Sequence, residues 1–286
     1  VRLSDKGFEK LGVLPGGRRV TDCCFVGDRL VTAEGVDGFA VYELDGPARF
    51  REVARRPSAG GRTPMAFWCW PAPDGKVVLT ARCGPYAVFD LADFAAERPL
   101  ATFYGTCLWD KYPADGAVDG RLPVLKPYNG LGWLDFNGPK PRFVDQEKAA
   151  TAPFFGAQGN GICRLGANRF LYTIQQPQSS VYDYGTAAFY VLVEADGTYS
   201  RPLALPAVPA FGKGRSARFS GIPRADGSLV LMTNRSERKA VVWDFADPEQ
   251  PKLLRAYTLS GNPDLGAFFR GRAVIPAGHQ GLVMER

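Results

Sequence analysis

The sequence predicts an all-β fold made of six repeats, each with four short antiparallel strands. Two markers that recur in step along the 286 residues support this prediction. The first is an apolar or aromatic strand that ends in an acid, as in "AVYEL" and "VVWDF". The second is a tight turn between two apolar runs, as in "FVGDRLV" and "RADGSLVLM". One such copy cannot bury its own apolar face, so the copies are expected to stack on one another.

The acidic marker sets the number of copies. It recurs at intervals of roughly 40 to 60 residues, close to the blade period of propellers. Five of its positions are acids, and the fourth, in "YVLVEADG", is apolar; in order they are Glu43, Asp90, Asp135, Val193, Asp244 and Glu285. We therefore expect a six-bladed β-propeller of four-stranded antiparallel blades, in one domain over residues 1–286. The alternative is a seven-bladed propeller, or a fragment of one.

The strands of each copy follow from the two markers. Asp-Gly and Gly-Asp steps supply the positive backbone angles that two-residue hairpins require, so the runs on either side of them are paired strands. Each copy is expected to begin with an inner strand such as "KLLRAYTL", followed by a strand before the tight turn. A third strand such as "SLVLMTN" and an outer strand such as "AVVWDF" complete it.

One segment carries a resemblance to a known family. "VVWDFADPEQPKLLRAYTL", and more faintly "AVFDLADFAAERPLATF", resembles the LVIVD-type repeats of bacterial propeller proteins. In that pattern an apolar strand is followed by Asp, a D-P-x-x-P elbow and a second apolar strand. The resemblance implies the propeller architecture and carries over no catalytic residues.

Composition excludes several classes of protein. The net charge is +6, but the basic residues are dispersed, and this favours neither nucleic-acid binding nor a basic helix. No run approaches the roughly eighteen apolar residues of a membrane-spanning helix. With a single histidine and no C-x-x-C pair among six cysteines, we expect no metal site and no cofactor. We interpret Cys24, Cys69 and Cys163 as buried small hydrophobes.

The candidate binding residues fall on two classes of longer loop that are expected to open on one face. Gly-Arg steps at equivalent places in three blades direct guanidinium groups at a shared space, where they suit carboxylate, sulfate or phosphate. These arginines are Arg18, Arg62 and Arg215, with Arg19 and Arg218 nearby. Amides suit hydroxyl-rich ligands, and the second set is Gln158, Asn160, Gln175, Gln176 and Asn234, with Arg235 beside them. The alternative is that the arginines pair with acids between blades and that the loops only cover the sheets.

Catalytic residues are harder to identify. His279, Tyr128 and Tyr182 are weak candidates for a general base, because each lies on a loop of the same predicted face. The sequence contains no Asp box of the sialidase type, G-x-S-x-G elbow, P-loop or dinucleotide fingerprint. A lone histidine in a glycine-containing turn is usually a solvated turn residue.

Three functions therefore compete. The first is a non-catalytic propeller that recognises an acidic glycan or a protein partner through the Arg/Gln/Tyr-rich loops. The second is a carbohydrate-active lyase or hydrolase acting on an acidic polysaccharide, and the third is a structural domain of a larger protein. We favour binding over catalysis and expect a monomer without nucleic-acid partners or membrane insertion. The compartment stays open, and one reading is a periplasmic or secreted protein that has lost a signal peptide.

Overall fold

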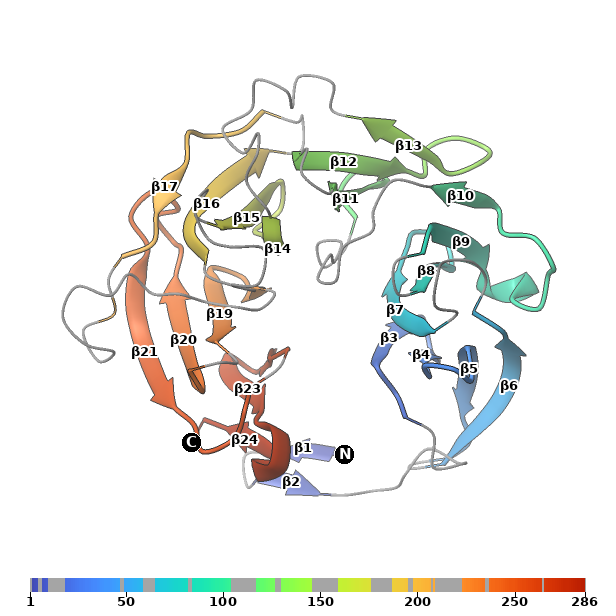
Figure 1. The fold of residues 1–286 in the computed structure, drawn as a ribbon, viewed down its shortest axis with the longest axis horizontal. Helices are drawn as coiled ribbons and strands as arrows, with labels where there is room; N and C mark the ends of the chain where they lie inside the picture. The colour runs from blue at the N-terminus through green and yellow to red at the C-terminus, as the bar shows by residue number, and fades with distance from the viewer. Residues whose placement is uncertain are drawn as a thin grey trace. The chain divides into compact units, whose positions relative to one another are not determined.

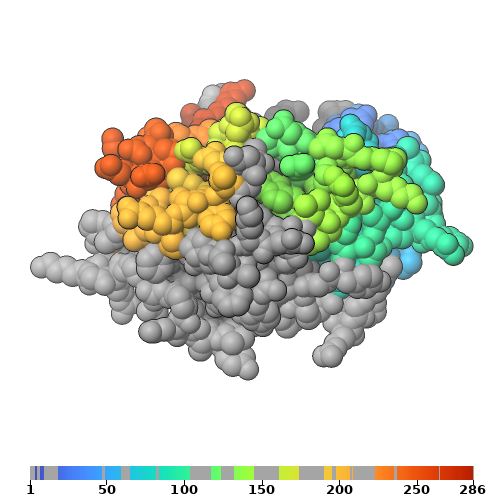
Figure 2. All heavy atoms as spheres, turned by 90° about the horizontal axis from the view of Figure 1, so that it is seen from above, coloured from blue at the N-terminus to red at the C-terminus, as the bar shows by residue number. Residues whose placement is uncertain are grey.

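We describe the chain from a computed structural model, and short antiparallel strands make up nearly all the regular structure of its described residues (Figure 1). The structure describes residues 2–4, 7–9, 19–46, 49–58, 65–81, 84–103, 117–126, 130–145, 159–175, 187–194, 198–206, 208, 223–234, 237–263 and 265–285, and Figure 2 draws the others in grey. This part of the chain also contains two single-turn helices, η1 (Leu91–Asp93) and η4 (Gly278–Gln280). Neither is long enough to cross a membrane.

The chain divides into two units. The first spans residues 1–109, 119–122 and 133–144, and it begins with a hairpin of β1 (Arg2–Ser4) and β2 (Gly7–Glu9). Two sheets follow. Blade 1 is formed by β3 (Asp22–Val26), β4 (Arg29–Ala33), β5 (Phe39–Leu44) and β6 (Phe50–Arg56). Blade 2 is formed by β7 (Ala66–Pro71), β8 (Lys76–Ala81), β9 (Tyr86–Asp90) and β10 (Ala101–Phe103).

The second unit spans residues 110–118, 123–132 and 145–286 and contains three sheets. Blade 4 is formed by β14 (Gly159–Leu165), β15 (Arg169–Gln175), β16 (Ala187–Glu194) and β17 (Leu203–Ala204). Blade 5 is formed by β18 (Arg224–Asp226), β19 (Leu229–Asn234), β20 (Lys239–Asp244) and β21 (Lys252–Thr258). Blade 6 is formed by β22 (Ala267–Phe269), β23 (Arg272–Pro276) and β24 (Leu282–Met284). Blade 3, with β11 (Arg121–Lys126), β12 (Gly130–Asp135) and β13 (Arg142–Asp145), has residues in both units.

After the β1–β2 hairpin, six antiparallel sheets follow in chain order, and they confirm the predicted fold class, a six-bladed β-propeller. Four of these sheets have four strands, and blades 3 and 6 have three within the described residues. The predicted order of strands within a blade was wrong by one strand. "KLLRAYTL" is not an inner strand, because among the described residues β21 pairs with β20 alone and ends blade 5. The strand before the tight turn is the first of its blade, and the acidic marker ends the third.

The register also corrects one marker position. In blade 1 the marker Glu43 lies opposite Arg29, the first residue of the second strand. In blade 4 the residue opposite the corresponding Arg169 is Glu194 and not Val193. The fourth copy therefore does have an acid at this place, one residue beyond the position that the sequence alignment assigned. Val193 is instead buried in β16.

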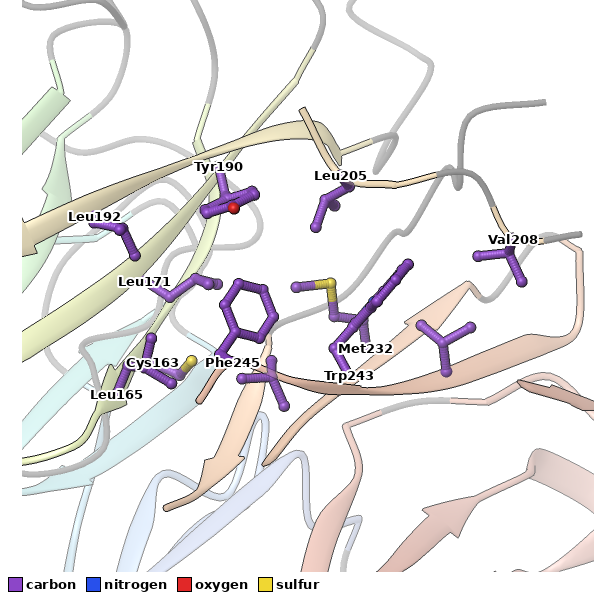
Figure 3. Packing of buried hydrophobic residues seen from close by; sticks show 12 residues of the cluster. Cys163, Leu165, Leu171, Tyr190, Leu192, Leu205, Val208, Met232, Trp243 and Phe245 are labelled. Atoms are coloured by element: carbon purple, nitrogen blue, oxygen red, sulfur yellow. The ribbon is translucent and has the colours of Figure 1, made fainter. Parts of the chain in front are cut away.

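The core of the second unit lies between blades 4 and 5. Figure 3 shows side chains of β14, β15 and β16 facing those of β19 and β20 across the space between the two sheets. Trp243 and Phe245 are buried there, and the Phe245 ring meets the edge of the Tyr190 ring at 5.4 Å between centroids. Blade-to-blade packing is thus where this repeat buries the apolar face that a single sheet would expose.

The equivalent core of the first unit lies between blades 1 and 2, whose first strands β3 and β7 lie side by side (Figure 1). Cys69 is buried in it, as Cys163 is in the second unit, and this confirms both as small core residues. Cys24 is half-buried against the same cluster. All the cysteines among the described residues are free thiols, and burial raises the pKa of Cys69 well above its ordinary value.

A glycine in blade 1 gives a test of this backbone geometry. Gly38 has φ +85°, and a Cβ added there would lie 2.2 Å from the carbonyl oxygen of Arg56. We expect Gly38→Ala to lower the free energy of unfolding by about 2 kcal/mol, because it combines left-handed strain with a backbone clash. Gly35→Ala is the matched control: its φ is +61°, but its Cβ would meet only Met65 Cε at 3.8 Å. Urea unfolding measures both variants. If they lose the same stability, the backbone near Arg56 moves to accommodate the new Cβ at residue 38, and the predicted extra cost of the clash is wrong.

Candidate functional site

Most of the residues predicted to bind a ligand lie outside the described part of the chain. These are Arg18, Arg62, Gln158, Gln176, Arg215, Arg218 and Arg235, together with Tyr128 and Tyr182. For Asn160 in β14 and Gln175 in β15 the structure gives the backbone position but not the surroundings of the side chain. The predicted arginine and amide face therefore stays a prediction.

Three of the predicted residues have described side chains. Arg19 is exposed just before β3. His279 is exposed in the middle of η4, in the loop between β23 and β24. Asn234 is buried at the end of β19, where its Oδ1 accepts the backbone N–H of Glu237 at 2.8 Å. Asn234 thereby holds the turn between β19 and β20, which gives this amide a structural role.

The recurring acid also has a structural role, which three blades show in the same form. Asp90, Asp135 and Asp244 each accept, through Oδ1, the backbone N–H of the residue two positions further on, at 2.8, 3.0 and 2.8 Å. The residue that follows each acid donates its own N–H to a carbonyl of the first tight turn, as Leu91 does to Gly75 at 3.1 Å. These Asx turns fix the start of the loop after the third strand. The marker acids are thus frame residues, not candidates for catalysis.

A cation lies opposite the acid in several blades. Arg29 is 3.1 Å from Glu43, and Arg169 pairs with Glu194 in the equivalent register. In blade 3 the carboxylate of Asp135 is buried and accepts two N–H groups of Arg142, the shorter bond being 2.8 Å. The backbone N–H of Asn137 and this guanidinium hold the pKa of Asp135 below its ordinary value, although burial opposes them.

These frame residues border a groove between blades 1 and 2, which we call groove A. It is lined by residues 25–29 of blade 1 and by residues 71–72, 74–75 and 90–92 of blade 2, and its volume is about 540 Å³. Val26 and Leu91 are buried in its floor, whereas the Phe25 side chain is 59% exposed at its edge. Groove A therefore combines an apolar floor with an aromatic residue at its edge.

The wall of groove A that blade 2 supplies is fixed by an arginine from blade 1. The guanidinium of Arg56 lies 3.4 Å from the centroid of the Phe89 ring and donates to the carbonyl oxygen of Phe94 at 3.0 Å. Arg56 is buried, and this burial lowers the pKa of its guanidinium. Arg29 adds a hydrogen bond to the Leu91 carbonyl oxygen at 3.3 Å. The groove is therefore pre-formed, which reduces the entropy lost on binding.

A second groove, groove B, occupies the equivalent position between blades 4 and 5. It is lined by residues 165–169, 194, 227–228, 245–246 and 248, with a volume of about 350 Å³. The register makes Leu165 the counterpart of Val26, and Arg169 the counterpart of Arg29. Arg164 then stands where groove A has Phe25, and its guanidinium donates to the carbonyl oxygens of Gly166 and Ala167. The exposed aromatic edge therefore distinguishes groove A from groove B.

Sequence reasoning missed groove A, although it used the residues that form it. "FVGDRLV" and "PAPDGKVVL" were interpreted as hairpin signals only. The available signal was an aromatic residue directly before a Gly-Asp turn, where the copy in blade 4 has Arg164. Within the described residues, no group of three His, Cys, Asp or Glu side chains is arranged to hold a metal ion.

Comparisons with known proteins show the fold but not a family. No family model matches the chain, and no curated protein matches it. Among solved structures, a chain of the outer coat vertex of COPII on membranes is similar with a TM-score of 0.69 and 11% identity, over 99% of this chain and 73% of that one. Sqt1 of Saccharomyces cerevisiae is similar with a TM-score of 0.58 and 10% identity, over 89% and 67%. The β-propeller domain of Cps50 (Swd1) of Myceliophteria thermophila is similar with a TM-score of 0.56 and 13% identity, over 94% and 86%.

Proposed function

We propose that this protein is a non-catalytic propeller that binds a short segment of another protein in groove A. The observation that carries the proposal is a pre-formed groove of about 540 Å³ with the exposed Phe25 at its edge. A groove of this volume holds a few side chains and not a folded surface, so the bound element is a short segment. That one structural neighbour is part of the COPII outer coat vertex, a protein assembly, supports a protein partner.

Selection from a phage-displayed library of random peptides tests this function. We expect peptides that bind the wild-type protein and lose about tenfold or more in affinity with Phe25→Ala, because truncating an aromatic anchor removes a large share of the contact area. Val36→Ala is the matched control, since Val36 is an exposed apolar residue of blade 1 in the loop between β4 and β5. If every selected peptide binds the Phe25→Ala variant as well as the wild type, groove A is not the binding site.

The acidic-glycan interpretation stays a second prediction, based on the Gly-Arg steps of the sequence. A glycan array run with wild-type protein and with an Arg62→Ala, Arg215→Ala double variant separates it from groove A. Binding that weakens with salt and is lost in the double variant, while Phe25→Ala retains it, would place the function on the arginine loops.

A further inference from the structure

Groove A carries more negative than positive charge, and this bears on what it binds. Its lining contains three aspartates, Asp28, Asp74 and Asp90, and a single arginine, Arg29. Arg29 is engaged by the Glu43 carboxylate at 3.1 Å and by the Leu91 carbonyl oxygen at 3.3 Å. The guanidinium of Arg29 is thus engaged by groups of the protein itself and is not available to bind a partner.

The aspartates are less fully engaged. Asp28 lies exposed in the turn between β3 and β4 and takes part in no ion pair of the described residues. The Asp74 side chain is 77% exposed, and its one ion pair, to Lys76 at 3.4 Å, is long. Asp90 uses Oδ1 to accept the Ala92 N–H, and Lys76, which lies opposite Asp90 in the sheet, makes its ion pair with Asp74. Both blades therefore contribute aspartates to the lining of groove A, beside its apolar floor.

Groove B provides an internal comparison. The charged residues of its lining are Arg169 and Glu194, and these two pair with each other. At the turn that corresponds to Gly27-Asp28 it has Gly166, Ala167 and Asn168, without an acid. Asp90 has a counterpart in blade 5, the marker acid Asp244, so the acids that distinguish the lining of groove A are Asp28 and Asp74.

We propose that groove A takes a partner segment in which an apolar side chain is flanked by Lys or Arg. The apolar side chain packs on the floor formed by Val26 and Leu91, with Phe25 at the edge of the groove, and the cations lie against Asp28 and Asp74. Charge complementarity of this kind sets specificity and association rate more than total affinity. This inference rests on the proposed function of the groove.

Fluorescence anisotropy with three labelled peptides of about twelve residues tests the charge requirement. Each peptide has a central Phe-Leu pair, and the flanking positions are Lys in the first, Gln in the second and Glu in the third. We expect the Lys peptide to bind most tightly and the Glu peptide most weakly, with the Lys peptide losing affinity as salt is added. Asp28→Asn and Asp74→Asn should each weaken the Lys peptide about two- to fivefold and leave the Gln peptide unchanged.

Two further variants make the outcomes distinguishable. Asp37→Asn, at the other end of the blade 1 sheet, is the charge-matched control and should have no effect beyond error. If the Gln and Glu peptides bind as tightly as the Lys peptide, and all three depend on Phe25, the charge inference is wrong while the proposed function stands. If the binding of all three is unchanged in Phe25→Ala, or none binds, groove A is not a peptide site, and both proposals fail.

Discussion

Replacing Trp243 with alanine is expected to lower the free energy of unfolding by about 3–5 kcal/mol, the largest effect that we expect from a single substitution. The indole is buried between blades 4 and 5 among side chains of both sheets, as Figure 3 shows. Its removal leaves a cavity that rigid sheets on either side cannot close by moving together. Urea unfolding followed by far-ultraviolet circular dichroism measures the change without relying on tryptophan fluorescence.

Trp243→Phe separates packing from hydrogen bonding at the same place. The indole Nε1 is buried and has no hydrogen-bond acceptor within reach among the described residues. Phenylalanine keeps most of the ring contacts and removes this unsatisfied donor, so we expect a loss of about 1 kcal/mol or less. Leu254→Ala, at an exposed site on β21, is the surface control. A Trp243→Ala variant as stable as this control would mean that the contact between blades 4 and 5 contributes little to folding.

Glu34→Ala is expected to cost about 3 kcal/mol, because it removes a buried carboxylate on which three donors converge. Glu34 is 2% exposed directly after β4. Its Oε1 accepts Thr32 Oγ1 at 2.8 Å and the Tyr42 hydroxyl at 2.7 Å, and its Oε2 accepts Arg55 Nη2 at 2.8 Å. The network joins three strands of blade 1. Glu52→Ala is the matched control, since Glu52 binds the same arginine but its side chain is 32% exposed, and a loss below about 1 kcal/mol is expected.

The same carboxylate makes this contribution depend on pH. Burial raises the pKa of Glu34, but the hydrogen bonds from Tyr42, Thr32 and Arg55 outweigh it, so the pKa in the folded protein lies below the ordinary value. The stabilisation is therefore fully present above the unfolded-state pKa of about 4.3 and is lost as the pH falls through the lower, folded-state value. The difference in stability between wild type and Glu34→Gln should shrink below about pH 4. A difference that stays constant from pH 7 to pH 3 would exclude ionised Glu34 as its source.

The number of blades could be predicted because the acid at the end of each third strand acts locally. Asp90 and Asp244 each accept the backbone N–H of a residue only two positions away. The motif is therefore a short stretch of sequence that can be recognised in each copy. The same motif does not show which strand is the first of a blade, so the order of strands within a blade could not be predicted from it. Successive antiparallel strands repeat without a marked beginning. Blade 5 is seen to end at β21 because no further strand of the described residues pairs with it. The LVIVD resemblance of this segment stays a prediction, since no family model matches.

Groove A could not be predicted, because the direction of the side chains in β3 is hidden in the sequence. In "DCCFV" apolar and cysteine residues follow one another, and no polar alternation shows which face is buried. The structure buries Val26 and exposes Cys23 and Phe25 on the opposite face of the strand. The buried position of Glu34 could not be predicted either. Its three hydrogen-bond donors come from β4, β5 and β6, and they meet only after blade 1 has formed.

The Asx turns after the third strands have a consequence for how this protein can change. Because Asp90, Asp135 and Asp244 are occupied by nearby backbone N–H groups, they hold the loops in shape whatever side chains line the grooves beside them. Residues next to the tight turns, such as Phe25 near the end of β3 and Arg164 near the end of β14, can then be exchanged between copies while the loops keep their shape. The chain is in this respect a modular scaffold, in which recognition properties could be transplanted from one inter-blade position to another by rewriting a few turn residues.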